Sequence, residues 1–275
     1  MDFRELVTFS ATSKENLQHC KKTMRSRVKE LLQEFGLEYD KTMIAMKEHS
    51  AIISGSTALA VLLADQFEPG DIDFYVRSHN ADGFHSWITS ETKYRDVEKS
   101  LTAKDSSYTR QNSGIHEVKW LAHSVSGKKM NLVSVQTPSA MGILPRFYTT
   151  LSMNVICWTG VGCAYPALTT RRVGVLAVKD SANFKPITER IEKAQKRGFV
   201  IASDWEEDVV VRALGVHKCG IGRTCPRGVR RTRSNRGFLW MALDRWEEGE
   251  MQENMPDIAW LMMPGRICGE KLNTP

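Results

Sequence analysis

The chain has 275 residues, of which 41% are hydrophobic and 25% are charged, and its formal net charge is +6. This composition is ordinary for a globular protein that buries its own hydrophobic core. The mild positive charge fits a polyanionic partner such as a nucleotide or nucleic acid, although solubility alone explains it equally well.

Several features argue against export and membrane insertion. The six cysteines are sparse and irregularly spaced, unlike the disulfide framework of a small secreted protein. The N-terminus lacks a cationic segment followed by an apolar run, and no stretch reaches about 18 apolar residues. We therefore expect an intracellular protein, in the cytoplasm or nucleus, without a signal peptide or transmembrane segment.

The first part of the chain predicts two helices. Apolar residues recur at steps of three and four over 12–35, where Thr12 and Glu15 fit a capping box and Gly36 fits a stop. A shorter helix is expected over 37–48. We expect these N-terminal helices, within residues 1–48, to pack on the core of the protein.

At residue 51 the pattern changes to strand, tight turn, helix and strand. Residues 51–64 begin with a short apolar run, turn at Gly55 and Ser56, and continue as a helical segment. After a Pro-Gly break, the alternation from Asp71 onward predicts a strand that carries Asp71 and Asp73 on one face.

The remaining elements follow in chain order. We expect a helix over 81–100, a hairpin of strands 118–122 and 130–135, a charged helix over 184–197, and helices and loops after 206. The predicted organisation is thus a core over 49–180 and a mainly helical, basic region over 181–275.

The turn at Gly55 and Ser56 is a candidate phosphate-binding site. Helix N-termini present unpaired backbone N–H groups and partial positive charge, and glycine lets the backbone approach a ligand closely. Taken alone, such a turn is more often only a helix cap. Asp71 and Asp73 point the same way from one strand, and two such carboxylates can hold Mg²⁺ or Mn²⁺. Taken alone, such a pair is more often solvated.

Both features together, with fourteen residues between Ser56 and Asp71, resemble the signature of the polymerase-β-like nucleotidyltransferase superfamily. Residues 147–168 and 225–237 are in addition similar to fungal members. The resemblance implies an α/β (α+β) nucleotidyltransferase fold with a small mixed sheet and flanking helices. It also implies that Gly55 and Ser56 hold the phosphates of a nucleoside triphosphate, and that Asp71 and Asp73 hold magnesium.

One position departs from the superfamily pattern. A third carboxylate is expected on a later strand, where the resemblance implies that it activates the attacking hydroxyl, but that place is taken by Asn131. An amide can coordinate a metal weakly and cannot act as a base near neutral pH. Glu117, on the preceding strand, could substitute if the register of the hairpin brings it close.

A second candidate region combines cysteine, histidine and arginine. His217, Cys219 and Cys225 could ligate structural zinc with a remote fourth ligand, or they could be ordinary buried or free side chains. The surrounding segment is rich in arginine and contains no Asp or Glu from 209 to 243. We expect Arg223, Arg230 and Arg231 to contact the nucleotide or another polyanion such as RNA, unless this segment is a solvated loop.

The leading functional hypothesis is metal-dependent transfer of a nucleotidyl group from a nucleoside triphosphate to a hydroxyl-bearing acceptor. The alternative is a catalytically impaired protein of the same fold that binds nucleotide or nucleic acid, and Asn131 favours it. A third reading is a basic interaction protein in which the motif is fortuitous.

Overall fold

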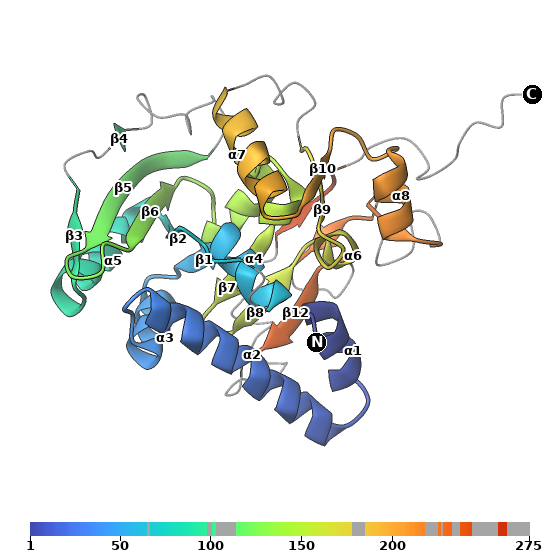
Figure 1. Ribbon diagram of the computed structural model, residues 1–275. Coiled ribbons are helices and arrows are strands. Elements are labelled where there is room, and N and C mark those ends of the chain that lie inside the picture. Colours follow the sequence, from blue (N-terminus) through green and yellow to red (C-terminus); the bar gives the residue numbers. More distant parts are fainter. Residues whose placement is uncertain are drawn as a thin grey trace, which may run out of the picture.

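The computed structural model describes residues 1–64, 67–97, 101–102, 114–177, 185–217, 225–226, 228–232, 237–243 and 258–262, with backbone only at 101, 102, 185 and 186. Within these residues the architecture is a mixed sheet with helices on both faces (Figure 1). The helices are α1 (Phe3–Ser10), α2 (Lys14–Glu34), α3 (Tyr39–Glu48), α4 (Ser56–Leu63), α5 (Ser78–Glu91), α6 (Pro166–Thr169), α7 (Lys185–Lys196) and α8 (Asp208–Leu214), with 3-10 turns η1 (Ala140–Arg146) and η2 (Thr150–Ser152).

The main sheet has the strand order β12-β8-β7-β1-β2-β6-β5-β3, and β4 also pairs with β5. Its strands are β1 (Ile52–Ser54), β2 (Asp71–Arg77), β3 (Tyr94–Asp96), β4 (Leu101–Thr102), β5 (Ile115–His123), β6 (Lys129–Val135), β7 (Asn154–Cys157), β8 (Gly160–Cys163) and β12 (Leu239–Ala242). The strands β2 and β6 run parallel, whereas β1 and β5 run antiparallel to their neighbours β2 and β6. The starts of β2 and β6 therefore lie side by side.

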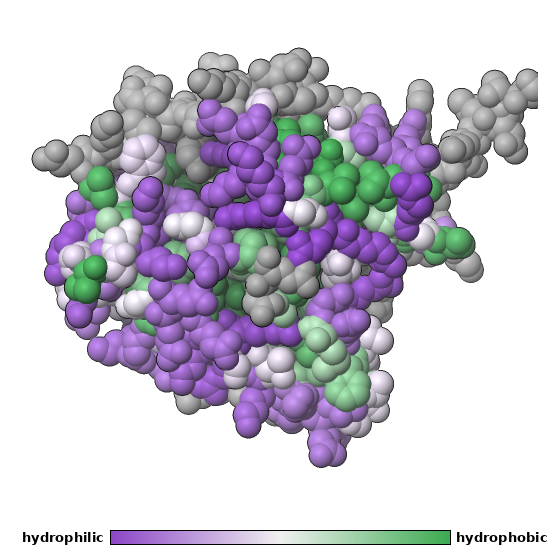
Figure 2. Space-filling view, in the orientation of Figure 1, coloured by the Kyte–Doolittle hydropathy of each residue, from purple (hydrophilic) through white to green (hydrophobic). Residues whose placement is uncertain are grey.

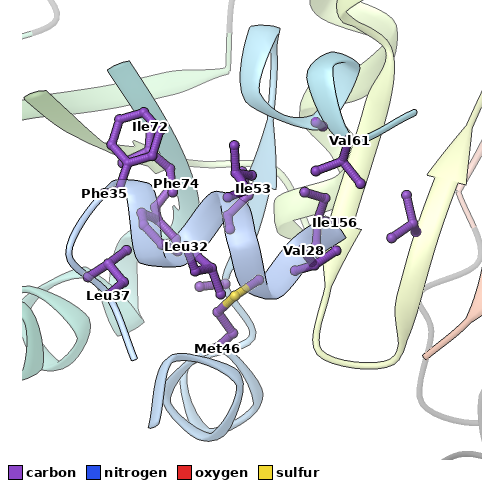
Figure 3. Packing of buried hydrophobic residues seen from close by; sticks show 14 of the residues in the cluster. Val28, Leu32, Phe35, Leu37, Met46, Ile53, Val61, Ile72, Phe74 and Ile156 are labelled. Carbon is purple, nitrogen blue, oxygen red and sulfur yellow. The ribbon is translucent and has the colours of Figure 1, made fainter. Parts of the chain in front are cut away.

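One face of the sheet packs against the N-terminal helices. Ile72 and Phe74 of β2 point to this face and contact a cluster that includes Val28 and Leu32 of α2 (Figure 3). All four side chains are buried, and each buried aliphatic or aromatic side chain contributes about 1.5–3 kcal/mol of transfer free energy. Helices α2 and α3 both contribute buried side chains to this cluster.

The opposite face carries a second cluster, which covers the later half of β2. Tyr75 of β2 and Val133 of β6 are buried there against residues of η1, α6 and α8. Asp71 and Asp73 lie on this same face but nearer the start of the strand, and both are only partly buried. The carboxylates thus lie at the margin of the core rather than inside it.

The N-terminal boundaries differ from the prediction. The first long helix begins at Lys14, because Ser13 rather than Thr12 accepts the capping bond from the backbone N–H of Asn16. Thr12 instead donates its hydroxyl to the carbonyl of Phe9, at the end of α1. The short helix α1 was not predicted.

The hairpin prediction is confirmed by β5 and β6. The helix expected over 81–100 is shorter and earlier, since α5 ends at Glu91 and β3 follows. The C-terminal region contributes more than helices, because β12 joins the main sheet beside β8 and two small pairs, β9 (Val173–Val175) with β10 (Val200–Ala202) and β11 (Arg230–Arg231) with β13 (Ala259–Trp260), form alongside.

Hydrophilic side chains cover much of the surface over α2 and α7 on the face shown in Figure 2. In the described part of the chain, every helix is too short or too polar to cross a membrane.

Candidate functional site

The turn between β1 and α4 is built around Gly55. Its φ of 75° and ψ of −143° lie in a region that residues with a Cβ rarely adopt, and an added Cβ would lie 3.1 Å from Oδ2 of Asp73. Helix α4 begins at the next residue, Ser56, and no side chain caps it. The first N–H groups of the helix are therefore not satisfied by a side-chain cap, as expected for a turn that binds an anion.

Asp71 is tied to this turn by a buried threonine. The hydroxyl of Thr57, in the first turn of α4, donates to the backbone carbonyl of Asp71 at 2.8 Å. Thr57 is 0% exposed, so the donor of this bond is shielded from water, whereas Asp71 is partly exposed. The start of β2 is consequently fixed relative to the start of α4, and the two halves of the motif form one unit.

Asn131 joins the two aspartates. Its Nδ2 donates to Oδ1 of Asp73 at 2.7 Å and to Oδ2 of Asp71 at 3.2 Å. The parallel register places Asn131 directly beside Asp73. The structure therefore brings together Gly55, Asp71, Asp73 and Asn131, and the last of these is a neutral amide.

Glu117 does not lie beside Asn131 and the two aspartates. It pairs with Ser134 of β6, whereas Trp120 pairs with Asn131. Since Ser134 and Asn131 are an odd number of residues apart, their side chains point to opposite faces of the sheet. Glu117 accordingly lies 4.0 Å from the ammonium of Lys119, which also contacts Asp82 of α5.

The pKa of Asp73 differs strongly from that of an ordinary aspartate. Burial, followed by the adjacent charge of Asp71, raises the pKa of Asp73 from 3.8 to about 7. The hydrogen bond from Asn131 and the charges of Arg190 and Lys193 act in the opposite direction. Near neutral pH the metal-free site therefore has a deficit of positive charge, which a bound cation would relieve.

This raised pKa predicts a pH-dependent stability of the metal-free protein. Between about pH 4 and pH 7 native Asp73 retains a proton that the unfolded chain releases, so this group contributes stability at low pH that is lost as pH rises through 7. Part of this loss has already occurred at pH 5 and all of it at pH 8, so the Asp73→Asn variant should exceed the wild type by more at pH 8 than at pH 5, and the difference should grow by an amount on the order of a few kcal/mol.

Urea unfolding in the presence of a chelator at the two pH values measures this difference. Asp82→Asn, which removes an exposed carboxylate, should leave the pH dependence of the wild type unchanged. Parallel pH profiles for wild type and Asp73→Asn would contradict the assignment.

Helix α7 supplies cations that the sequence did not assign to the site. Arg190 and Lys193 act on Asp73, and a Cβ on Gly70 would lie 3.8 Å from the ammonium of Lys193. Burial lowers the pKa of Arg197, and the charge of Asp71 acts in the opposite direction. The spacing of 190, 193 and 197 corresponds to one face of a helix, and this periodicity in the charged segment is a signal that could have grouped them.

The donor set fits a hard cation. Asp71 and Asp73 offer carboxylate oxygens from one face, and the amide of Asn131 can offer its oxygen after turning about its side-chain bond. In the part of the chain that the structure describes, no group of three or more His, Cys, Asp or Glu side chains is placed to hold a metal. A cation at the pair would therefore depend on two carboxylates, an amide and its own ligands.

The zinc prediction remains untested. Cys219 lies outside the described residues, Cys225 is buried, and Nδ1 of His217 lies 2.9 Å from the carbonyl oxygen of Gly215. Because a carbonyl only accepts hydrogen bonds, Nδ1 carries the proton, and Nε2 is the nitrogen that remains as an acceptor or ligand.

The arginines predicted to bind the nucleotide have different environments. Arg223 lies outside the described residues, and Arg231 is exposed on β11. Arg230 is only 1% exposed, and its guanidinium donates to the carbonyls of Ala164, Cys225 and Gly228 at 2.8–3.1 Å. Its Cζ lies 4.5 Å from the ring centre of Tyr165. The expectation that Arg230 binds phosphate is not supported, because its donors are directed to buried backbone.

We expect Arg230→Met to destabilise the protein by about 3 kcal/mol, because it leaves buried carbonyls without their charged donor. Denaturant unfolding measures this loss, and calorimetry should give an unchanged nucleotide affinity for the folded variant. Arg231→Met, at the exposed neighbouring position, is the matched control and should change stability by less than about 1 kcal/mol. A weakened nucleotide affinity without a loss of stability would restore Arg230 to the binding site.

Comparison with solved structures finds similarity to CCA-adding enzyme over most of the chain. The apo form I of that enzyme gives a TM-score of 0.41 at 15% identity, covering 68% of this chain and 45% of the enzyme structure. Its complex with CTP gives 0.40 at 14% identity, covering 78% and 46%. The chain thus spans less than half of these structures. No family model matches the sequence, and no curated protein matches it.

Proposed function

We propose that the chain is a metal-dependent nucleotidyltransferase that transfers a nucleotidyl group from a nucleoside triphosphate to a hydroxyl-bearing acceptor. The observation that carries the proposal is the placement of Asp71 and Asp73 beside the Gly55 turn, with Thr57 fixing the distance between them. A turn that binds phosphate and a carboxylate pair that binds a cation are useful together only when the cation and the phosphates belong to one ligand.

In this proposal Gly55 and Ser56 hold the terminal phosphates through backbone N–H groups at the start of α4. The charges of Arg190 and Lys193, on α7, offset part of the negative charge of the site. Asp71 and Asp73 would hold Mg²⁺ or Mn²⁺, and such a cation would stabilise the negative charge that develops during transfer.

The reaction forms a bond between the acceptor oxygen and the α-phosphorus, and it breaks the bond to the oxygen that leads to the β-phosphate. Pyrophosphate leaves on the side of the turn. Asn131 orients Asp71 and Asp73 through its two hydrogen bonds, but an amide does not accept the proton of the attacking hydroxyl. The proton is therefore lost to solvent, and we expect slow transfer.

A second candidate function is nucleotide binding without transfer. The same Asn131 favours it, because the register excludes Glu117 as a replacement for the missing carboxylate. The two functions share a binding site and differ only in whether pyrophosphate is released.

Calorimetric titration with ATP, GTP, CTP and UTP, each with and without Mg²⁺, tests the shared binding site. Tight binding that requires Mg²⁺ supports both candidates, and a following assay of pyrophosphate release separates them. If none of the four nucleotides binds, both candidates fail, and the basic segment that contains the exposed Arg231 becomes the region to examine.

A further inference from the structure

Trp120 lies in line with the proposed catalytic residues. Ser54 of β1 pairs with Asp73 of β2, Asp73 pairs with Asn131 of β6, and Asn131 pairs with Trp120 of β5. Residues that pair directly on adjacent strands point to the same face of a sheet. One row of side chains therefore crosses four strands, from the phosphate-binding turn at one end to an indole at the other.

The side chain of Trp120 is only half-buried. It packs at the edge of the second core cluster, on the face that also buries Val118 and Val133. Its backbone carbonyl accepts a hydrogen bond from the N–H of Val97 at 2.9 Å, which fixes this part of β5. A fixed strand with a partly exposed indole offers a flat apolar surface whose position is defined.

The direction of the proposed reaction places the acceptor on the indole side. Pyrophosphate leaves toward the turn that follows Ser54, and the attacking oxygen must approach from roughly the opposite direction. That direction leads from Asp73 over Asn131 to Trp120. Adjacent strands are about 4.8 Å apart, so Trp120 lies roughly 10 Å from Asp73 along the row. This distance accommodates one ring between the reacting phosphorus and the indole.

We propose that Trp120 is a specificity-determining residue on which the acceptor stacks. The acceptor then carries its attacking hydroxyl on a flat or flat-faced ring, as in a nucleoside or a sugar. Tryptophan stacks well on both, because its face is apolar and its ring is rigid. This inference rests on the proposed function, since the direction of attack follows from the phosphate-binding turn.

Fluorine NMR on protein labelled with 5-fluorotryptophan tests this proposal. The resonance of Trp120 is assigned by its loss in Trp120→Phe. The protein is first saturated with Mg²⁺ and α,β-methylene-ATP, and it is then titrated with adenosine and, separately, with methyl glucoside. We expect at least one of these ring compounds to shift the Trp120 resonance, and the pair distinguishes a nucleoside from a plain sugar.

The variants separate stacking from packing. Trp120→Leu keeps an apolar side chain and should lower the affinity for the ring compound by about tenfold or more, whereas Trp120→Phe should lower that affinity less. Both should bind the ATP analogue within about twofold of the wild type, since the analogue occupies the other end of the row. Trp158→Leu, which alters a half-buried tryptophan packed on the opposite core cluster, is the control and should change neither affinity.

Two results would overturn this inference and leave the proposed function standing. One is binding of the ATP analogue with no shift of Trp120 by either ring compound. The other is an equal loss of affinity for the analogue and for the ring compound in Trp120→Phe, which would mean that the indole contacts the nucleotide. Failure of wild type to bind the analogue would instead remove the proposed function, and this inference with it.

Discussion

The double variant Asp71→Asn/Asp73→Asn is expected to lose magnesium-dependent nucleotide binding. The two carboxylates are the anionic ligands of the proposed cation, and asparagine keeps their shape while removing their charge. The affinity for ATP in the presence of Mg²⁺ should fall by about 100-fold or more, since losing even a residue that only supports a metal ligand costs 10–100-fold.

The same variant should behave differently without metal. Arg190 and Lys193 are then no longer offset by Asp73, so ATP in the presence of a chelator should bind no more weakly than to the wild type, and the binding should weaken with added salt. Calorimetry with Mg²⁺ and with chelator measures both affinities. The variant that removes Asp82 and Asp96, two exposed carboxylates, matches the change in net charge and should retain the magnesium dependence. Retention of that dependence in the double variant itself would place the metal elsewhere.

Replacing Asn131 by aspartate is expected to produce the largest increase in the rate of pyrophosphate release. The new carboxylate would lie beside Asp73 in the parallel register, where it could bind the metal and accept the proton of the attacking hydroxyl. General-base catalysis contributes about 10²–10⁴-fold, so pyrophosphate release with a competent acceptor should rise by at least about 10²-fold.

This gain has a cost in the metal-free state. Three adjacent carboxylates repel one another, so unfolding with chelator at pH 8 should show lower stability than the wild type, and added Mg²⁺ should restore it. Asn131→Ala removes the amide without adding charge and should not increase release. If Asn131→Asp binds Mg²⁺ more tightly but releases no pyrophosphate, the site is a nucleotide-binding site whose transfer function is blocked by more than the missing base.

The sequence located the Gly55 turn and the Asp71–Asp73 pair because both depend on local patterns. A glycine before a helix and a period of two along a strand are readable within a few residues. The interest in Asn131 came from the resemblance to the superfamily, and its place beside Asp73 depends on the parallel pairing of β2 and β6. Excluding Glu117 from the site required knowing which residues of β5 and β6 pair, because a shift of one residue moves every side chain to the other face of the sheet.

The remaining site features depend on contacts between distant parts of the chain, which local sequence patterns do not reveal. The charged helix expected over 184–197 was not assigned to the site, because the sequence does not tell which distant element a basic face approaches. Arg230 was read with its neighbours as part of a phosphate-binding run, yet it fills a buried position against Tyr165. A run of arginines gives no local signal that separates the one directed into the protein from those directed to solvent.

The hydrogen bond from Thr57 to the carbonyl of Asp71 has a consequence for how the site responds to a ligand. Because the Thr57 donor is buried, we expect the first turn of α4 and the first residues of β2 to open and close together rather than one at a time. An anion held at Gly55 is therefore expected to slow amide hydrogen exchange at the beginning of β2. Hydrogen exchange in β2, the strand that carries Asp71 and Asp73, should therefore report whether an anion occupies the Gly55 turn.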